Sequence, residues 1–446
     1  MPASPLDSAL YRDLLGDGEV GALFSDSAEV RAMLLVEGAL ARAQGAVGLI
    51  PEVSAAFIHR AALEVQIDPA ALAAETGQNG VPVPALVAAF RRAMEAPAHA
   101  AYVHWGATSQ DIVDTGLILR LRQALAIMET RLASVIRDLG RLAESHADLP
   151  VAARTYAQVA TPTSFGAIVA SWGAPLIRHH ARLAELRPRL LNVSLSGAAG
   201  TLSVMEGKGA EIRAAMARDL GLKDPGGSWH STRDGMMELA GWLTLLATSL
   251  GKMGEDLIWL SQSGIAEVGL GGGGGSSTMP QKQNPVAPSL LVTLARVQGG
   301  LNTAAQGAGL HRQQRDATAW FTEWMVLPQM VLGAARTLAV AQALVPRITP
   351  NAERMRAGID DGLGLIHAEA LSFALTRRMP RPEAQAAVKA LCKEAQATGA
   401  SLAALATRDW PDTDWGTLLT PEAQLGDAPA EARAFAQSAA TVVARA

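Results

Sequence analysis

A glycine-rich stretch followed by polar residues is the part of this sequence best suited to chemistry. From Gly269 to Pro285 it reads Gly-Leu-Gly-Gly-Gly-Gly-Gly-Ser-Ser-Thr-Met-Pro-Gln-Lys-Gln-Asn-Pro. An Asn-Pro pair is typical of the start of a helix, where free N–H groups attract anions. The stretch brings four polar side chains to that point: Ser276, Ser277, Lys282 and Asn284. We therefore predict a mobile lid that closes over an anionic ligand.

Two other interpretations of the glycines are weaker. Gly269, Gly271 and Gly274 have the spacing of a dinucleotide-binding fingerprint. That site needs a strand before the glycines and a βαβ unit around them, and the sequence predicts neither. A flexible Gly/Ser linker is the plain alternative, but such linkers do not end in Met-Pro-Gln-Lys-Gln-Asn-Pro. We expect no nucleotide and no other cofactor.

A second stretch with chemical potential runs from His104 to Thr115 and reads His-Trp-Gly-Ala-Thr-Ser-Gln-Asp-Ile-Val-Asp-Thr. Thr108 and Asp111 have the spacing of a capping box before an apolar periodic run, which predicts a helix start. The hydroxyls of Thr108 and Ser109, the imidazole of His104 and the helix N-terminus together suit a carboxylate. The capping role and the binding role are compatible.

Two further polar stretches have a structural and a functional interpretation. Residues Arg154–Gly166 are expected to run from a loop into a helix, and His311–Asp316 to form a charged patch inside an apolar helix. Each is either a solvated face or a basic patch that neutralises an anionic ligand inside a bundle. The nine histidines show no metal-binding spacing, and His179 and His180 point about 100° apart on a helix. We expect no metal site.

Composition narrows the class of protein. The chain has 446 residues, 49% of them hydrophobic and 18% charged, with a net charge of −4. A large core is therefore possible. The chain has no excess of Lys and Arg, so its charge gives no indication that it binds nucleic acid. The single cysteine excludes an internal disulfide framework and fits a reducing compartment. With no signal-peptide pattern and no uninterrupted apolar span, we expect a cytoplasmic protein that does not cross a membrane.

The elements that must position these residues are predicted to be helical. The sequence is rich in Ala and Leu, contains only 4% aromatic residues, and shows no strand–turn–strand pattern. We predict an all-α fold in three blocks: residues 1–102, 103–345 and 346–446. The central block holds four long apolar periodic segments, 109–147, 162–190, 233–263 and 285–340. Segments of this length indicate a helix bundle or packing between subunits.

Three motifs in this order resemble the fumarase/aspartase superfamily. Gly275–Pro285 matches its signature Gly-Ser-Ser-x-Met-Pro-x-Lys-x-Asn-Pro at every defined position. Gly106–Thr115 resembles a second conserved region, and Arg154-Thr155 with Pro162 a third. Within the superfamily these motif sequences are most similar to those of bacterial 3-carboxy-cis,cis-muconate cycloisomerases, followed by those of adenylosuccinate lyases.

The resemblance implies an architecture. It implies three all-α domains, of which the central one is a long five-helix bundle. Four subunits would combine these bundles into a twenty-helix core, and each active site would lie where three subunits meet. The substrate would be a small polycarboxylate, and the activity would be lactonisation of 3-carboxy-cis,cis-muconate during aromatic-compound breakdown.

The resemblance also implies roles for individual residues. Ser276 aligns with the catalytic base of the superfamily. The positions that align with substrate-binding residues are His104, Thr108, Ser109, Thr155, Lys282, Asn284 and Arg315. His230 lies near the site by analogy. Two positions depart from the family pattern, because Gln314 stands where Glu is usual and Gln385 replaces a common His.

Tyr156 is the departure that decides between activities. Superfamily lyases that expel amines commonly carry a histidine there as general acid, and Val159 offers no substitute imidazole. An expelled amine needs a proton in the transition state, whereas a carboxylate, with a pKa of about 4, leaves without one. We place Tyr156 among the substrate-binding residues, and its identity favours lactone chemistry over amine release.

Two other classes of function remain open. One is a fumarate-releasing lyase of the adenylosuccinate type or a nitrite-expelling relative, the latter also needing no acid at Tyr156. The other is a non-catalytic structural relative, which the intact Ser276, Lys282 and Asn284 argue against.

Overall fold

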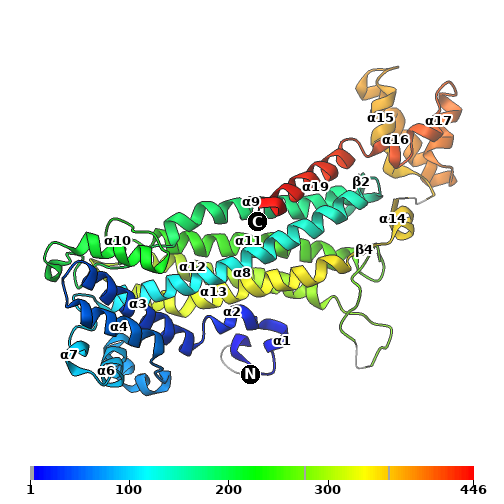
Figure 1. Ribbon diagram of the computed structural model, residues 1–446. Coiled ribbons are helices and arrows are strands. Elements are labelled where there is room, and N and C mark those ends of the chain that lie inside the picture. Colours follow the sequence, from blue (N-terminus) through cyan, green and yellow to red (C-terminus); the bar gives the residue numbers. More distant parts are fainter. Residues whose placement is uncertain (1–4, 276–277, 360–361, 446) are drawn as a thin grey trace. The chain divides into compact units, whose positions relative to one another are not determined.

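The computed structural model describes residues 5–275, 278–359 and 362–445, and they form a mostly helical fold (Figure 1). Ser276 and Ser277 lie outside the described residues. Helices of 23 to 37 residues form the longest elements: α8 (Ser109–Ser145), α9 (Phe165–Leu190), α11 (Asp234–Leu260), α12 (Val286–Ala308) and α13 (Ala317–Leu344). The chain divides into two compact units, and each of these five helices contributes to both.

The first unit comprises residues 1–130, 179–247 and 294–339. Its shorter helices are α1 (Arg12–Leu15), α2 (Gly18–Ala22), α3 (Asp26–Ala46), α4 (Glu52–Glu64), α5 (Ala73–Asn79), α6 (Val83–Ala93), α7 (Pro97–Ala100) and α10 (Gly209–Leu220). Helix α3 packs against both α4 and α10. Helix α6 shows why these segments are helical: Val83, Leu86, Val87 and Phe90 recur at three and four residues and are all buried in the core of the unit.

The second unit comprises residues 131–178, 248–293 and 340–446. Its shorter helices are α14 (Ala352–Ile359), α15 (Ala368–Leu375), α16 (Arg381–Thr398), α17 (Leu402–Asp409), α18 (Trp415–Leu418) and α19 (Ala428–Arg445). Helices α15, α16 and α17 gather in one group with their own apolar core, drawn in orange in Figure 1. Six short 3-10 turns complete the helical elements of the described residues in the two units.

A β-hairpin in the second unit corrects the expectation of a chain without strands. Strand β1 (Pro150–Thr155) pairs antiparallel with β2 (Gln158–Ser164), where the sequence was expected to run from a loop into a helix. A second, minimal pair joins β3 (Val268–Gly269) to β4 (Thr349–Pro350). The hairpin was missed because Ala and Pro interrupt its β-branched residues, so no clean alternation remains. The fold is therefore mostly helical rather than purely α-helical.

The long apolar segments are largely confirmed, with one break. Helices α8, α9 and α11 occupy the predicted segments 109–147, 162–190 and 233–263 to within a few residues. The predicted segment 285–340 is two helices, because residues 309–316 form a non-helical connection between α12 and α13. The charged patch His311–Asp316 therefore lies in a loop rather than inside a helix. There Gln313 adopts a left-handed φ of 55°, and Asp316 accepts hydrogen bonds from two backbone N–H groups instead of continuing the helix.

One helix resembles a membrane span by length and composition alone. Residues 317–347 are apolar enough to cross a bilayer, but 61% of the apolar window is buried inside the structure, as in the core helix of a soluble protein. Arg336 interrupts its apolar surface and donates to the carbonyl oxygens of Asp13 and Leu14.

Each of the three predicted blocks is one continuous stretch of sequence, whereas each of the two compact units combines three separate stretches. The three-block division stays a prediction.

Candidate active site

The N-terminus of α8 carries the predicted capping motif. The backbone N–H of Thr108 donates to Oδ2 of Asp111 at 3.0 Å, and the helix begins at Ser109. The hydroxyl of Thr108 is left for another partner, because the Asp111 N–H bonds to the Thr108 carbonyl oxygen instead. Half of the predicted capping box is therefore present: the Asp111 side chain caps the Thr108 N–H, but the Thr108 hydroxyl does not cap the helix. Both Thr108 and Ser109 are half-buried at the positive end of a 37-residue helix.

Arg315 reaches this helix end from the loop between α12 and α13. Its guanidinium donates to Oγ1 of Thr108 at 2.6 Å and to the carbonyl oxygen of Ala198 at 3.1 Å. The side chain is exposed, and no carboxylate among the described residues pairs with it. Arg312 in the same loop is instead neutralised by Asp316, whose carboxylate it contacts at 2.6 Å. Arg315 thus brings an unneutralised charge to a helix N-terminus, the arrangement that suits a carboxylate ligand.

Asp111 organises the surroundings of the helix start. It is fully buried, and its two oxygens accept from the backbone N–H groups of Ser196 at 2.8 Å and Gly197 at 3.0 Å. The segment Ser194–Gly197 is therefore held against α8. His230 contacts Asp111 as well, with Nε2 2.9 Å from Oδ1, and is only 2% exposed. His230 lies beside the site, and its predicted contact with substrate stays a prediction.

A buried ion cluster under α8 was not anticipated. Arg233, at the start of α11, contacts Asp114 at 2.7 Å and Glu323 at 2.6 Å, and all three side chains are at most 2% exposed. The Arg233 guanidinium also stacks on the Trp229 ring at 4.7 Å. Burial lowers the pKa of Arg233, but the two carboxylates outweigh burial and raise it above its usual range. In the sequence, this cluster could have been suspected only from the charged residues that stand within or beside apolar helical segments.

His104 is held by a carboxylate that the sequence did not single out. Its Nδ1 lies 2.7 Å from Oε1 of Glu37 on α3, and Glu37 is 1% exposed. Burial lowers the pKa of His104, but the charge and hydrogen bond of Glu37, helped by Asp111, outweigh it and leave the pKa raised. The first unit therefore brings together His104, Thr108, Ser109, Arg315 and His230 around one helix start.

In the second unit, Thr155 and Tyr156 lie at the tip of the β-hairpin. Tyr156 and Ala157 form its two-residue turn with φ of 49° and 61°, so two non-glycine residues adopt the left-handed conformation. Both Thr155 and Tyr156 are exposed. The base of the tip is fixed by Arg154, which binds Glu267 at 2.8 and 2.6 Å. Such left-handed positions persist where the surrounding structure enforces them and often mark functional sites.

The glycine-rich loop closes on itself before α12. Gly274 and Asn284 exchange two backbone hydrogen bonds of 3.1 and 3.0 Å. Helix α12 begins at Val286, so Asn284 closes the loop rather than capping the helix, a shift of one residue from the prediction. Lys282 is exposed, and no ion pair of it is present in the described part of the loop. The predicted catalytic residue Ser276 lies outside the described residues.

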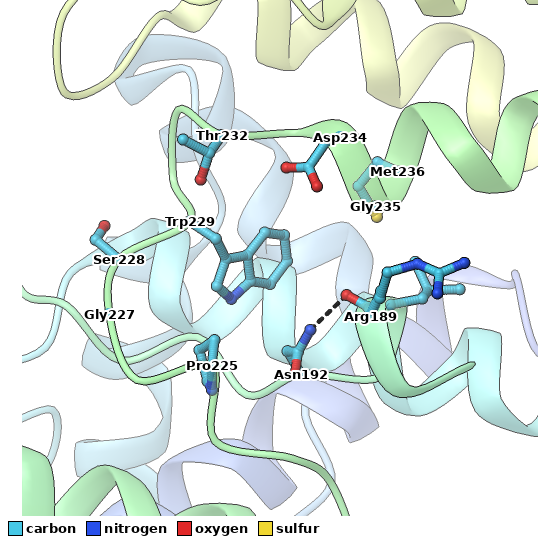
Figure 2. A pocket seen from close by; sticks show the side chains of 11 residues that line it. Arg189, Asn192, Pro225, Gly227, Ser228, Trp229, Thr232, Asp234, Gly235 and Met236 are labelled. Carbon is cyan, nitrogen blue, oxygen red and sulfur yellow. Dashed lines mark hydrogen bonds between the residues drawn. The ribbon is translucent and has the colours of Figure 1, made fainter. Parts of the chain in front are cut away.

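Two cavities lie near the loops of the first unit. One, of about 510 Å³, is lined by Leu195, Ser196, residues 200–203 and Arg213, among others. The other, of about 280 Å³, contains Trp229 and Asp234 and is shown in Figure 2, where Asn192 bonds to the carbonyl oxygen of Arg189. Trp229 precedes His230, yet His230 itself lines neither cavity.

Among residues 5–275, 278–359 and 362–445 no cluster of His, Cys, Asp and Glu side chains is placed to hold a metal ion.

The described residues form a mostly helical fold in which Arg315 contacts the start of α8 and a glycine-rich stretch precedes α12. A family model described as Lyase matches residues 19–299. The chain belongs to this lyase family, within the fumarase/aspartase superfamily.

Individual relatives have more specific names. The chain is 41% identical over 382 residues to a 3-carboxy-cis,cis-muconate cycloisomerase of Pseudomonas aeruginosa, covering 84% of this chain and 83% of the relative. It is 34% identical to a nitrosuccinate lyase of Streptomyces davaonensis, covering 96% and 94% of the two chains. The crystal structure of the 3-carboxy-cis,cis-muconate lactonizing enzyme from Pseudomonas putida matches with a TM-score of 0.91 at 34% identity, over 98% of this chain and 100% of that one.

Proposed function

We propose that this protein lactonises 3-carboxy-cis,cis-muconate to a carboxymuconolactone. The observation that carries the proposal is the Arg315–Thr108 pair, a guanidinium without a carboxylate partner in the described chain, held at the start of α8. A substrate with several carboxylates needs fixed cationic donors of this kind. The 41% identity to a cycloisomerase of Pseudomonas aeruginosa supports the choice within the family.

The proposed reaction adds a carboxylate oxygen of the substrate to a conjugated double bond of the same molecule. A C–O bond forms, and the displaced π electrons build negative charge beside a neighbouring carboxylate. Lys282 and loop N–H groups stabilise that charge, while Arg315 and Thr108 hold a carboxylate. Ser276 then passes a solvent-derived proton to carbon, which completes the lactone. The local positive field must make this serine a competent proton relay.

Tyr156 supports lactone chemistry over amine release. It occupies the turn of the hairpin, where amine-expelling relatives of the superfamily commonly carry histidine. In the ring-opening direction the group expelled from the lactone is a carboxylate, which leaves without a proton at neutral pH. The absence of an imidazole at the tip is therefore compatible with the proposed reaction and unfavourable for an aminosuccinate substrate.

A second candidate is a nitrite-expelling lyase. The match to the nitrosuccinate lyase extends over 96% of this chain, and nitrite also leaves without needing an acid at Tyr156. Two assays separate the candidates. Loss of muconate absorbance with lactone formation by NMR supports the cycloisomerase, whereas nitrite release from nitrosuccinate without lactone formation supports the lyase.

The carboxylate site is tested by Arg315→Gln. Loss of a charge-assisted contact is expected to raise KM about tenfold or more. Arg312→Gln is the matched control, because it removes a guanidinium from the same loop whose charge Asp316 already neutralises. Equal effects of the two substitutions would show that the loop, rather than Arg315 itself, matters.

A further inference from the structure

The backbone around His104 is held in place by two helices of the first unit. Arg91 on α6 donates to the carbonyl oxygen of Val103 at 2.9 Å, and Gln44 on α3 donates to that of Trp105 at 2.7 Å. His104 between them adopts a left-handed φ of 64°. A non-glycine residue stays in that conformation only where its surroundings enforce it. The position of the imidazole is therefore determined by the structure and not left to a flexible loop.

Glu37 is an unusual partner for this imidazole. Glu37 is 1% exposed, and its carboxylate has one side-chain hydrogen-bond partner among the described residues, Nδ1 of His104 at 2.7 Å from Oε1. Its other oxygen, Oε2, has no hydrogen-bond partner among the described residues. Burial of a carboxylate with so few hydrogen bonds costs desolvation free energy, unless an opposite charge lies beside it. The imidazolium form of His104 provides that charge.

The remaining charges facing His104 differ in sign. Asp111 on α8 favours the imidazolium and Arg91 on α6 opposes it, while Glu37 on α3 has the larger influence. Burial alone lowers the pKa of His104, and it is the carboxylates that leave the pKa raised. The charge of His104 therefore depends on Glu37, and without Glu37 burial would favour the neutral ring.

The bond to Glu37 also determines which nitrogen remains for a ligand. With Nδ1 committed, Nε2 carries the second N–H of an imidazolium. No hydrogen-bond partner of Nε2 is present in the described parts of the chain, and the side chain keeps 20% of its surface exposed. His104 precedes the start of α8 by only five residues, so its charge adds to that of Arg315 near the same helix N-terminus.

We propose that Glu37 is a positioning residue that holds His104 as an imidazolium, so that Nε2–H serves as a second cationic donor for a substrate carboxylate beside Arg315. The choice of substrate rests on the proposed function, but the charge state of His104 does not. An anionic substrate then loses affinity when His104 loses its proton, and Glu37 sets the pH at which that occurs. Glu37 itself touches no substrate.

The first experiment measures the charge of His104 without any substrate. The ¹³Cε1 NMR signal of His104, assigned by its absence in His104→Gln, is followed through a pH titration of the wild type and of Glu37→Gln. The wild-type ring is expected to stay protonated to higher pH than the ring in Glu37→Gln. Gln44→Leu is the matched control, since it removes a contact from the same helix to the same loop without removing charge. Identical titrations in the wild type and Glu37→Gln would overturn the proposal.

The second experiment uses whichever carboxylate substrate the wild type turns over. At neutral pH Glu37→Gln should raise KM about tenfold or more with a smaller change in kcat. Lowering the pH should restore KM, because the His104 ring of this variant becomes protonated again. A purely structural defect would show no such recovery.

His104→Gln provides a second test that does not depend on how well Glu37→Gln folds. It should raise KM at every pH and show no recovery on acidification. An unchanged KM in either variant would overturn the role of His104 in binding. A shifted titration in an enzyme that forms no lactone would support the role of Glu37 and refute the proposed reaction, so the two failures are distinguishable.

Discussion

The guanidinium of Arg315 donates a 2.6 Å hydrogen bond to Oγ1 of Thr108, although 207 residues separate the two in sequence. The bond joins the loop after α12 to the residue that directly precedes α8, inside one compact unit. It brings a positive charge to a helix end that already attracts anions. The other predicted ligands Lys282, Asn284, Thr155 and Tyr156 belong to the second unit.

Ser276→Ala should abolish turnover while leaving substrate affinity largely intact. Ser276 handles a proton in the transition state, whereas the carboxylates are held in the ground state as well. The measurement is kcat by absorbance and Kd by calorimetry. Ser277→Ala is the control and should lose much less. Equal losses in the two variants would mean that the wrong serine of the pair has been assigned.

Replacing Gly272 and Gly273 by Ala should lower kcat. Gly272 has a φ of 133°, and a Cβ on Gly273 would come within 2.9 Å of the Asn284 carbonyl oxygen. The side chains would strain the loop that carries Ser276 and Lys282. Turnover by the double variant is compared with that of Gly300→Ala, where a Cβ meets open space. Unchanged turnover in the double variant would count against closure of this loop in catalysis.

Tyr156→His should not accelerate lactone formation. A leaving carboxylate needs no acid, and an imidazole with an ordinary pKa near 6.5 is mostly neutral at pH 7. A modest loss is expected, because the phenol ring and hydroxyl are removed. The wild type should release no fumarate from adenylosuccinate or argininosuccinate in an absorbance assay. Robust release from either would refute both the Tyr156 argument and the cycloisomerase assignment.

Arg233→Met should lower the free energy of unfolding by about 3–5 kcal/mol, because it leaves Asp114 and Glu323 buried without a cation. Denaturant titration followed by circular dichroism measures the change. Arg189→Met is the control, since the Arg189–Glu238 pair is exposed and screened by solvent. If the two variants were equally stable, the buried cluster would not hold α8 in place.

We propose that the protein is a homotetramer whose active sites combine residues of three subunits. Large apolar side chains stay exposed on the long helices: Leu245 and Trp259 on α11, Val297 on α12 and Met325 on α13. In the proposed tetramer these side chains would pack against the long helices of partner subunits. Light scattering should give four times the mass of one chain. A stable and active monomer would contradict the proposal.

Signals that depend on near neighbours in the chain were accessible from the sequence alone. The capping pair Thr108 and Asp111 predicted the start of α8, and apolar spacing predicted α9 and α11. The signature Gly275–Pro285 indicated the family. Each of these patterns is local, because a helix and its cap are formed by residues three or four positions apart.

The contacts that build the site depended on the tertiary structure. The partnership of Glu37 with His104 spans 67 residues, and that of Asp114 with Arg233 spans 119. Pairing across the hairpin overrode the weak strand propensity of residues 150–164, and the tight chain reversal around Gln313 interrupted an apolar run that read as one helix. Hydrophobic periodicity specifies which residues are buried, but it does not specify which charged group meets which. That choice is made when distant segments fold together and each buried charge must find a counter-charge or a hydrogen bond.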